Sequence, residues 1–325
     1  MKLSEIVKGA ATIGISGHIR PDGDCTGSTM ALYLYLKKIC KAAQIKLFLE
    51  NRQETMRDLK YLDEIDTEYA WDGSFDVFFA LDCAKDRLGK AEKYFDSAPI
   101  TVNIDHHISN ANGCGSLNYV EPKASSTSEL IYELIKADEN SLPLEERMDE
   151  EIALAVYIGM IHDTGVFQYS NTTPRTLTDA AELIAYGFDF PRIIEETFYQ
   201  KTYIQNQIMG RALLESIQFM DGRCIVSCVD RKTMEFYGVE PVDLGGIVNQ
   251  LCNIKGVDCA IFMYETGLME YKVSMRSNEK VNVSQVASYF GGGGHVRAAG
   301  CTMKGTYHDC INNLSLYIAK QLEKE

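Results

Sequence analysis

Carboxylate and imidazole side chains gather at four points of the 325-residue sequence, each directly after an apolar run. The first point is the segment HIRPDGDCTGS, which carries His18, Asp22 and Asp24. Pro21 and Gly23 favour a tight turn, so both carboxylates are expected to project from one loop. An Asp-Gly-Asp sequence is also typical of an Asx turn that caps a helix, so this loop alone does not assign a function.

The other three points have a similar composition. Asp82 closes the run VFFAL, Asp105, His106 and His107 close the run TVNI, and Asp163 closes an apolar helix pattern. An Asp at the C-terminus of a helix is unfavourable against the helix dipole, which suggests a role such as metal coordination. Taken singly, an Asp after a strand is also typical of a helix cap. Two adjacent histidines are also typical of a hydrogen-bonded structural pair.

The histidines strengthen the case for a metal site. Five of the six lie in these segments or in a later Gly₄-His segment, and only His308 stands apart. Carboxylates with imidazoles suit hard ions such as Mn²⁺ or Mg²⁺, and Zn²⁺ less well. Six ligands with one shared carboxylate fit a two-metal site, whose ions lie ~3.5–4 Å apart and serve in-line phosphoryl displacement. We interpret His162, beside Asp163, as a core or supporting imidazole rather than a ligand.

The elements that must position these residues are strands alternating with helices. Continuous apolar runs, as in strands covered on both faces, include DVFFAL. Strands are expected over 12–17, 45–49, 76–81 and 100–104, with helices over 31–39, 150–161 and from 174 to near 187. This alternation predicts an α/β fold with a doubly wound parallel sheet. The loops at the carboxyl ends of its strands would bring the first three clusters to one edge.

The pattern of residue types along the chain changes near Pro191. A long helix over 192–215 is expected to connect two domains, and Asp221-Gly222 marks a hairpin turn beyond it. The predicted organisation is a catalytic domain over 1–190, a connector helix over 191–215, and a smaller α+β domain over 216–325.

The second domain contains a glycine run followed by histidine. No Ser-rich tract surrounds the run, and ordering four glycines costs much backbone entropy, although a flexible linker remains an alternative. Such a run allows backbone N–H groups to approach an anion closely, and an Arg at a strand end can grip phosphate bidentately. The candidate anion-binding residues are Arg276, Gly291, Gly292, Gly293, Gly294 and His295. Arg87 and Arg175 are further candidates, but a solvated surface position is the safer interpretation for both.

The composition limits the partners. There are 46 Asp and Glu against 32 Lys and Arg, a net charge of −14. This charge argues against tight binding of long nucleic acid or of anionic lipid, but not against a small anionic substrate. No apolar run is long enough for a secretory signal or a membrane span. Ten cysteines without CxxC spacing indicate reduced thiols and a cytoplasmic location, with oxidation sensitivity of Cys25 and Cys83 as a minor alternative.

Together, the four clusters resemble the four motifs of the DHH phosphoesterase superfamily. The matching segments are HIRPDGDCTGS, LDC around Asp82, DHH at 105–107 and DTG from Asp163. The segments SMRS around Arg276 and GGGGHVRAAG over 291–300 resemble the DHHA1 domain. The resemblance covers nearly the whole chain, and by length and motif style it is nearest to stand-alone nanoRNases, the oligoribonuclease/pAp phosphatases.

The resemblance implies roles for individual residues. One ion would be held by His18, Asp22 and Asp82, and the other by Asp24, Asp82, His106 and Asp163. Asp105 would orient a ligand histidine, and His107 would face the reacting phosphate. The glycine run with His295 and Arg276 would hold the terminal phosphate or nucleotide. Gln168 stands at a position where the family resemblance would also allow a basic side chain. If relatives use that position to bind substrate, the resemblance implies a different substrate preference for this chain.

The implied function is two-metal hydrolysis that uses Mn²⁺, with Mg²⁺ as the alternative ion. Short oligoribonucleotides would yield nucleoside 5′-monophosphates, and 3′-phosphoadenosine 5′-phosphate would yield AMP. Alternatives are a phosphodiesterase for linear dinucleotides (pApA or pGpG), a RecJ-like single-strand exonuclease, and a nucleotide-binding regulator without activity. The expected partner is a small nucleotide rather than long duplex nucleic acid or a membrane, and the resemblance is compatible with a homodimer.

Overall fold

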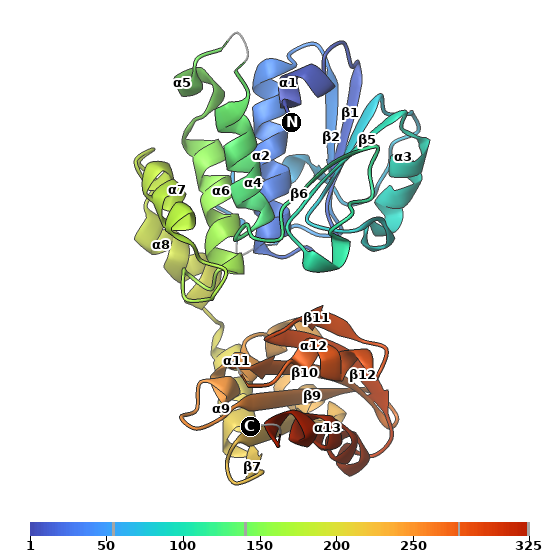
Figure 1. Ribbon diagram of the computed structural model, residues 1–325, viewed down its shortest axis with the longest axis vertical. Helices are drawn as coiled ribbons and strands as arrows, with labels where there is room; N and C mark the ends of the chain where they lie inside the picture. The colour runs from blue at the N-terminus through green and yellow to red at the C-terminus, as the bar shows by residue number, and fades with distance from the viewer. Residues whose placement is uncertain (54–55, 140–141, 279, 324–325) are drawn as a thin grey trace. The chain divides into compact units, whose positions relative to one another are not determined.

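The chain folds as two compact units, Met1–Gln200 and Lys201–Glu325 (Figure 1). The computed structural model describes residues 1–53, 56–139, 142–278 and 280–323. The first unit is an α/β unit around a parallel sheet and the second has a separate mixed sheet, which confirms the predicted fold class. None of the helices in the described parts of the chain has the length and apolar character needed to span a bilayer.

The sheet of the first unit has the order β3-β2-β1-β4-β5-β6, and all neighbouring strands are parallel. Its strands are β1 (Thr12–Ser16), β2 (Gln44–Phe48), β3 (Ile65–Asp66), β4 (Val77–Leu81), β5 (Ile100–Asp105) and β6 (Leu117–Val120). The strand order reverses between β1 and β4. Ligands of open parallel sheets bind outside the carboxyl ends of the strands at such a switch point.

Helices cover both faces of this sheet. The helices of the unit are α1 (Leu3–Ile6), α2 (Gly23–Ile39), α3 (Glu92–Ser97), α4 (Thr127–Ala137), α5 (Leu144–Arg147), α6 (Glu150–Asp163), α7 (Pro174–Ile184) and α8 (Phe190–Ile194). In Figure 1, α2, α4 and α6 stand together on one side of the sheet and α3 on the other. An aromatic cluster that includes Phe48, Phe75, Phe78 and Tyr94 fills the α3 side.

Two glycines allow α2 and α6 to approach closely. A Cβ atom on Gly27 would lie 2.5 Å from the Ala155 carbonyl oxygen. One on Gly159 would lie 1.9 Å from the Ser128 hydroxyl oxygen on α4 and 2.9 Å from Asp24 Oδ1. Substitution at Gly27 therefore pushes α2 and α6 apart, and substitution at Gly159 also pushes α6 away from α4. The close packing matters for function because Asp24 begins α2 and Asp163 ends α6.

The helix predicted after the Asp-Gly-Asp segment begins earlier than expected. The sequence pattern predicted a helix over 31–39, but α2 begins at Gly23. The reason is that Asp22 caps the helix by accepting a hydrogen bond from the Cys25 N–H at 3.0 Å. Asp24 therefore lies in the first helical turn rather than in a loop.

The second unit is a six-stranded sheet of order β11-β12-β10-β9-β8-β7, in which only the β8–β9 pair is parallel. Its strands are β7 (Ile217–Phe219), β8 (Cys224–Val229), β9 (Cys259–Gly267), β10 (Glu270–Ser277), β11 (Gly293–His295) and β12 (Ala298–Lys304). Its helices are α9 (Tyr203–Leu214), α10 (Arg231–Tyr237), α11 (Ile247–Cys252), α12 (Val283–Ser288) and α13 (Tyr307–Leu322). The β7–β8 pair confirms the hairpin predicted at Asp221-Gly222.

The single connector helix predicted over 191–215 is not formed. The segment contains α8, a π-helical turn over Glu195–Tyr199, an extended Gln200, and then α9. A capping box in which Thr202 and Gln205 bond to each other's backbone N–H groups starts α9 as a new helix. The two halves of the predicted connector therefore belong to different compact units.

Candidate metal centre

The carboxyl ends of β1, β4 and β5 bring the first three sequence clusters together, and the end of α6 adds the fourth. His18 Nε2 lies 3.5 Å from Asp82 Oδ2 and 3.7 Å from Asp22 Oδ1. His106 Nε2 lies 3.7 Å from Asp82 Oδ1 and 3.4 Å from Asp163 Oδ2. Asp82 therefore lies between two groups of donors, the position that the family resemblance implies for a shared carboxylate.

Asp24 completes the second group. Its Oδ2 atom lies 3.9 Å from His106 Nε2, and donor atoms of Asp24, His106 and Asp163 all lie within 4.8 Å of one another. Donor atoms around one ion with bonds near 2.1 Å are typically about 3–3.5 Å apart. Small side-chain movements would therefore fit this donor set to a divalent cation.

The imidazole tautomers also suit metal binding. His18 Nδ1 lies 2.8 Å from the Ile19 carbonyl oxygen, and His106 Nδ1 lies 3.4 Å from that of Ala124. A carbonyl oxygen accepts only, so in each ring Nδ1 carries the proton. The lone pair of Nε2 is left to face the carboxylates, which is the arrangement found in metal-ligating histidines.

The site is electrostatically costly without a cation. Burial, and then the charges of Asp82 and Asp163, raise the pKa of Asp24 well above its usual range. Burial and the charge of Asp82 likewise raise the pKa of Asp163. Carboxylates held this close repel each other when ionised, and divalent cations would remove the repulsion.

Helix α4 fixes two of these carboxylates, a feature that sequence reasoning missed. The N–H groups of Thr127 and Ser128 donate to Asp24 Oδ2 at 2.7 Å and Oδ1 at 2.9 Å. The Thr127 hydroxyl donates to Asp82 Oδ1 at 2.9 Å. The positive end of the helix dipole thus holds buried anions. The segment STSE over 126–129 marks the cap that starts α4. It does not mark the partners of Thr127 and Ser128, because Asp24 and Asp82 lie far earlier in the chain.

Asn171 supports the fourth cluster and was also missed. Its Nδ2 atom lies 2.8 Å from the Ser125 carbonyl oxygen, 3.1 Å from that of Asp163 and 3.3 Å from Asp163 Oδ2. It thereby ties the end of α6 to the segment before α4. No sequence pattern marks this residue, because its partners come together only in the fold.

Asp105 and His107 form a second hydrogen-bonded pair beside the donors. Asp105 Oδ1 lies 2.8 Å from His107 Nδ1, and Asp105 Oδ2 accepts from Asn110 Nδ2 at 2.7 Å. Burial lowers the pKa of His107, but the Asp105 hydrogen bond and the charge of Asp82 outweigh it, and the pKa is raised to about 9. Asp105 therefore orients His107, whereas the sequence-based interpretation had Asp105 orienting a ligand histidine.

His162 agrees with the supporting role expected from the sequence. Its ring packs against Gly23 and lies 5.5 Å from the Phe198 ring. Burial lowers its pKa to about 4 against the opposing charge of Asp22, so the ring is neutral at physiological pH. Arg175 pairs with Glu133 and Asp179, which agrees with its interpretation as a surface residue.

The two cysteines beside the centre are buried. Burial raises the pKa of Cys25 to about 11, against the opposing influence of His18, and raises the pKa of Cys83 well above its usual value. Thiols that keep their protons react slowly with oxidants, so the oxidation-sensitive alternative loses support. All ten cysteines are free.

Two anion-binding candidates of the second unit lie on strands of its sheet, His295 on the edge strand β11 and Arg276 on the interior strand β10. His295 on β11 pairs with Ala298 on β12, which pairs with Arg276 on β10. Residues directly opposite across strands share a face, so Arg276 and His295 flank a small alanine, about 10 Å apart at the backbone. Two side chains that can donate hydrogen bonds to an anion thus share one face of the sheet.

The glycine run does not form the set of free backbone N–H groups that was expected to approach an anion. The N–H groups of Gly291 and Gly292 donate to the carbonyls of Ser288 and Ala287, so they close the end of α12. Gly294 has φ +142, and a Cβ there would lie 2.4 Å from the Ala298 carbonyl oxygen. The glycines therefore allow β11 to pack tightly against β12.

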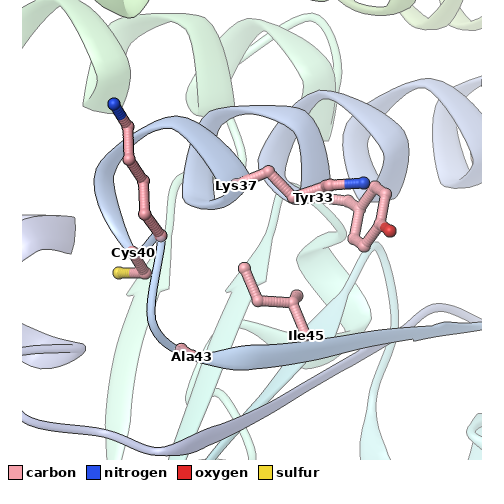
Figure 2. A pocket seen from close by; sticks show the side chains of 6 residues that line it. Tyr33, Lys37, Cys40, Ala43 and Ile45 are labelled. Carbon is pink, nitrogen blue, oxygen red and sulfur yellow. The ribbon is translucent and has the colours of Figure 1, made fainter.

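The pocket in Figure 2 is separate from the centre. It is lined by Tyr33, Lys37, Cys40, Lys41, Ala43 and Ile45, at the C-terminal end of α2. At 1.5 Å per residue, Lys37 is about 20 Å along the helix from Asp24. The pocket contains none of the predicted site residues.

Comparison with known proteins agrees with this geometry. Residues 12–160 match the N-terminal domain of the DHH family, and residues 221–324 match the DHHA1 domain. The chain belongs to the DHH family and carries a DHHA1 domain.

Two similar relatives carry the same printed name, bifunctional oligoribonuclease and PAP phosphatase NrnA. The Thermus thermophilus protein is 32% identical over 316 residues, 93% of this chain and 88% of the relative. The Bacillus subtilis protein is 28% identical over 293 residues, 90% of this chain and 89% of the relative. A solved structure, an exopolyphosphatase-related protein from Bacteroides fragilis, has TM-score 0.89 at 24% identity, and the match covers 99% of this chain and 96% of that one. That likeness shows the fold.

Proposed function

We propose that this chain is a two-metal phosphoesterase for short oligoribonucleotides and 3′-phosphoadenosine 5′-phosphate. The products are nucleoside 5′-monophosphates and AMP, respectively. The observation that carries the proposal is the pair of donor groups joined by Asp82, since a shared carboxylate is what a two-metal hydrolytic site requires. The names of the two NrnA relatives support the substrate class.

The ligands are assigned from the same geometry together with the family motifs. One ion is held by His18, Asp22 and Asp82, and the other by Asp24, Asp82, His106 and Asp163. The donors are mostly carboxylate oxygens, which favours Mn²⁺ or Mg²⁺. When bound, such ions lower the pKa of water and neutralise charge on a reacting phosphate.

Side chains beside the metal ligands are proposed to orient the substrate and to transfer a proton. Asp105 holds the Nδ1 proton of His107, and its side chain, 22% exposed, presents Nε2 for contact with phosphate. The hydrogen bond to Asp105, which helps to raise the pKa of His107 to about 9, favours the imidazolium form, and this form can donate a proton to the leaving oxygen. The proposed role of Arg276 and His295 is to bind the end of the substrate.

The acidic charge and the free thiols support the remaining assignments. A net charge of −14 disfavours long polyanions, and so supports a small nucleotide over the RecJ-like alternative. Ten free cysteines support a cytoplasmic location.

A product-resolved assay with Mn²⁺ tests the proposal. It compares a dinucleotide, a five-residue RNA, a long single strand and 3′-phosphoadenosine 5′-phosphate. We expect the short RNAs and 3′-phosphoadenosine 5′-phosphate to be hydrolysed, the long strand to be spared, and a chelator to stop all turnover. Asp82→Asn, prepared in parallel, controls for contaminating nuclease. Exclusive hydrolysis of linear dinucleotides would establish that alternative, and binding without turnover would establish the regulator.

A further inference from the structure

Cys25 lies in a buried cluster of three different donor types at the His18 end of the centre. A ring nitrogen of His18, the Cys25 sulfur and a carboxylate oxygen of Asp82 all lie within 4.8 Å of one another. The three residues are 5%, 0% and 2% exposed. Within residues 1–53, 56–139, 142–278 and 280–323, this is the one three-donor cluster that contains a thiol. The ligand sets assigned above do not use that thiol.

The fold holds the thiol in this place from two sides. A Cβ atom on Gly17 would lie 2.2 Å from Cys25 Sγ, so the sulfur occupies the space that a side chain at 17 would take. The Cys25 N–H donates to Asp22 Oδ1, and its carbonyl accepts from the Thr29 hydroxyl at 2.7 Å. The sulfur therefore packs against the residue that immediately precedes His18.

A nitrogen, sulfur and oxygen donor set has a distinct metal preference. Zn²⁺ binds Cys sulfur, His nitrogen and carboxylate oxygen in tetrahedral sites, with bonds of about 2.0–2.3 Å. Mn²⁺ and Mg²⁺ prefer oxygen, and Zn²⁺ stands above Mn²⁺ in the general affinity order for divalent ions. A thiol at this position raises the preference for Zn²⁺ over Mn²⁺.

We propose that Cys25 makes the His18 end of the centre a binding site for a thiophilic divalent ion, Zn²⁺ above all, formed by His18, Cys25 and Asp82. On binding, the thiol releases its proton to solvent and the sulfur takes the ion. The fourth position is filled by water or by Asp22, whose side chain is 63% exposed and whose Oδ1 lies 3.7 Å from His18 Nε2.

This site has a consequence for the centre, and that consequence rests on the proposed function. Because His18 and Asp82 are shared, Zn²⁺ bound with Cys25 excludes the hard ion from the same ligands. Zn²⁺ therefore acts as a competitive inhibitor against Mn²⁺. The binding of Zn²⁺ itself does not depend on any substrate.

The first experiment measures binding without activity. Metal-free protein is titrated with Cd²⁺, a thiophilic probe whose bond to a thiolate gives an ultraviolet charge-transfer band, and with Zn²⁺ by calorimetry. The variants are Cys25→Ser and Cys25→Ala, and the matched control is Cys83→Ala, which removes a buried thiol next to Asp82 but outside the cluster. Circular dichroism and thermal unfolding identify the folded variants.

We expect the first equivalent of Cd²⁺ to give the band in the unchanged protein and in Cys83→Ala, and the band to be lost in both Cys25 variants. The Zn²⁺ affinity should fall at least about tenfold in Cys25→Ser. An unchanged band or Zn²⁺ affinity in folded Cys25→Ser overturns the proposal. Cys25→Ser keeps the size of the side chain, so the test stands even if Cys25→Ala fails to fold.

The second experiment measures competition. Zn²⁺ is added to hydrolysis supported by Mn²⁺, and each protein's rate is normalised to its own rate without Zn²⁺. We expect half-inhibition in the Cys25 variants to need at least about ten times more Zn²⁺, and added Mn²⁺ to relieve inhibition of the unchanged protein. Equal inhibition of all variants contradicts the inference. Absence of any hydrolysis contradicts the proposed function instead, while the Cd²⁺ band still decides the site.

Discussion

The donor cluster of the first unit lies among buried side chains, whereas His295, an anion-binding candidate of the second unit, lies on an exposed edge strand. Asp24, Asp82 and Asp105 are at most 2% exposed, and each accepts hydrogen bonds from neighbouring groups. His295 is exposed, and β11 pairs only with β12 among the described strands. The carboxylates of the first region are fixed by several independent contacts. The strand that carries His295 is held by its pairing with β12 and by the Ser284 hydroxyl, which donates to the Gly294 carbonyl oxygen at 2.8 Å.

This difference predicts that the two regions contribute to different parts of the proposed reaction. Buried groups with fixed geometry can stabilise a transition state, because they need little rearrangement when charge develops. Exposed groups contribute mainly to binding, since solvent competes with them in the free protein. Changes in the first region should therefore lower kcat or metal affinity, and changes in the second should raise KM.

Removal of the shared carboxylate should have the largest effect. Asp82 has φ +60, a left-handed backbone that Asn tolerates better than Ala does, so Asp82→Asn is the better-folded test. We expect kcat to fall on the order of 10⁴-fold, because both ions lose a ligand. Product-resolved assay with Mn²⁺ and calorimetric titration of Mn²⁺ measure the two effects. Near-normal turnover in this variant would falsify the two-metal assignment.

Asp105→Asn should have the next largest effect. Asp105 holds the Nδ1 proton of His107 and keeps the pKa of that ring raised to about 9. Without the carboxylate the pKa falls, so His107 loses its proton at a lower pH than before. We expect kcat to drop about 10²–10³-fold and the alkaline limb of the pH–rate profile to move to lower pH. A smaller rate with an unmoved alkaline limb would mean that Asp105 has only a structural role.

Thr127 tests whether helix α4 preorganises the centre. Thr127→Val keeps the shape and the backbone N–H that bonds to Asp24, but removes the hydroxyl that donates to Asp82. We expect Mn²⁺ affinity to fall by about 10–100-fold, and Thr127→Ser to restore most of it. Calorimetry measures the affinity. Equal affinities of the Val and Ser variants would show that the hydroxyl is not needed.

The proximity of the candidate ligands could be predicted because their sequence signals are local. Each cluster follows a strand or ends a helix, and parallel strands bring their carboxyl ends to one edge whatever the loops do. Hence His18, Asp82 and His106 could be placed together without a structure. The glycine run was harder, because its N–H groups serve the end of α12 and only the fold shows which donors are used.

The supporting residues of the centre could not be predicted, because they act through contacts between residues far apart in the sequence. Thr127 and Asn171 carry no motif, and each acts through a partner that only the packing of α2, α4 and α6 supplies. The break in the predicted connector helix was present in the sequence as Thr202 and Gln205, a capping box hidden inside a helical pattern. Helical periodicity does not show where one helix ends and the next begins, so local capping signals must be weighed against it.

The smallest effect on catalysis is expected for a substitution on the exposed edge strand β11, which tests the comparison in the second unit. His295→Ala should raise KM about tenfold and leave kcat within a small factor, because a solvent-exposed imidazole contributes to binding more than to the chemical step. The matched control is His308→Ala, which removes a histidine outside the proposed sites, on α13. Steady-state kinetics with 3′-phosphoadenosine 5′-phosphate separates the two constants.

If His295→Ala lowers kcat as strongly as Asp105→Asn does, the second unit takes part in the chemical step and the division between the regions is wrong. If KM is unchanged, His295 does not hold the substrate, and Arg276, on the same face of the sheet, becomes the remaining candidate.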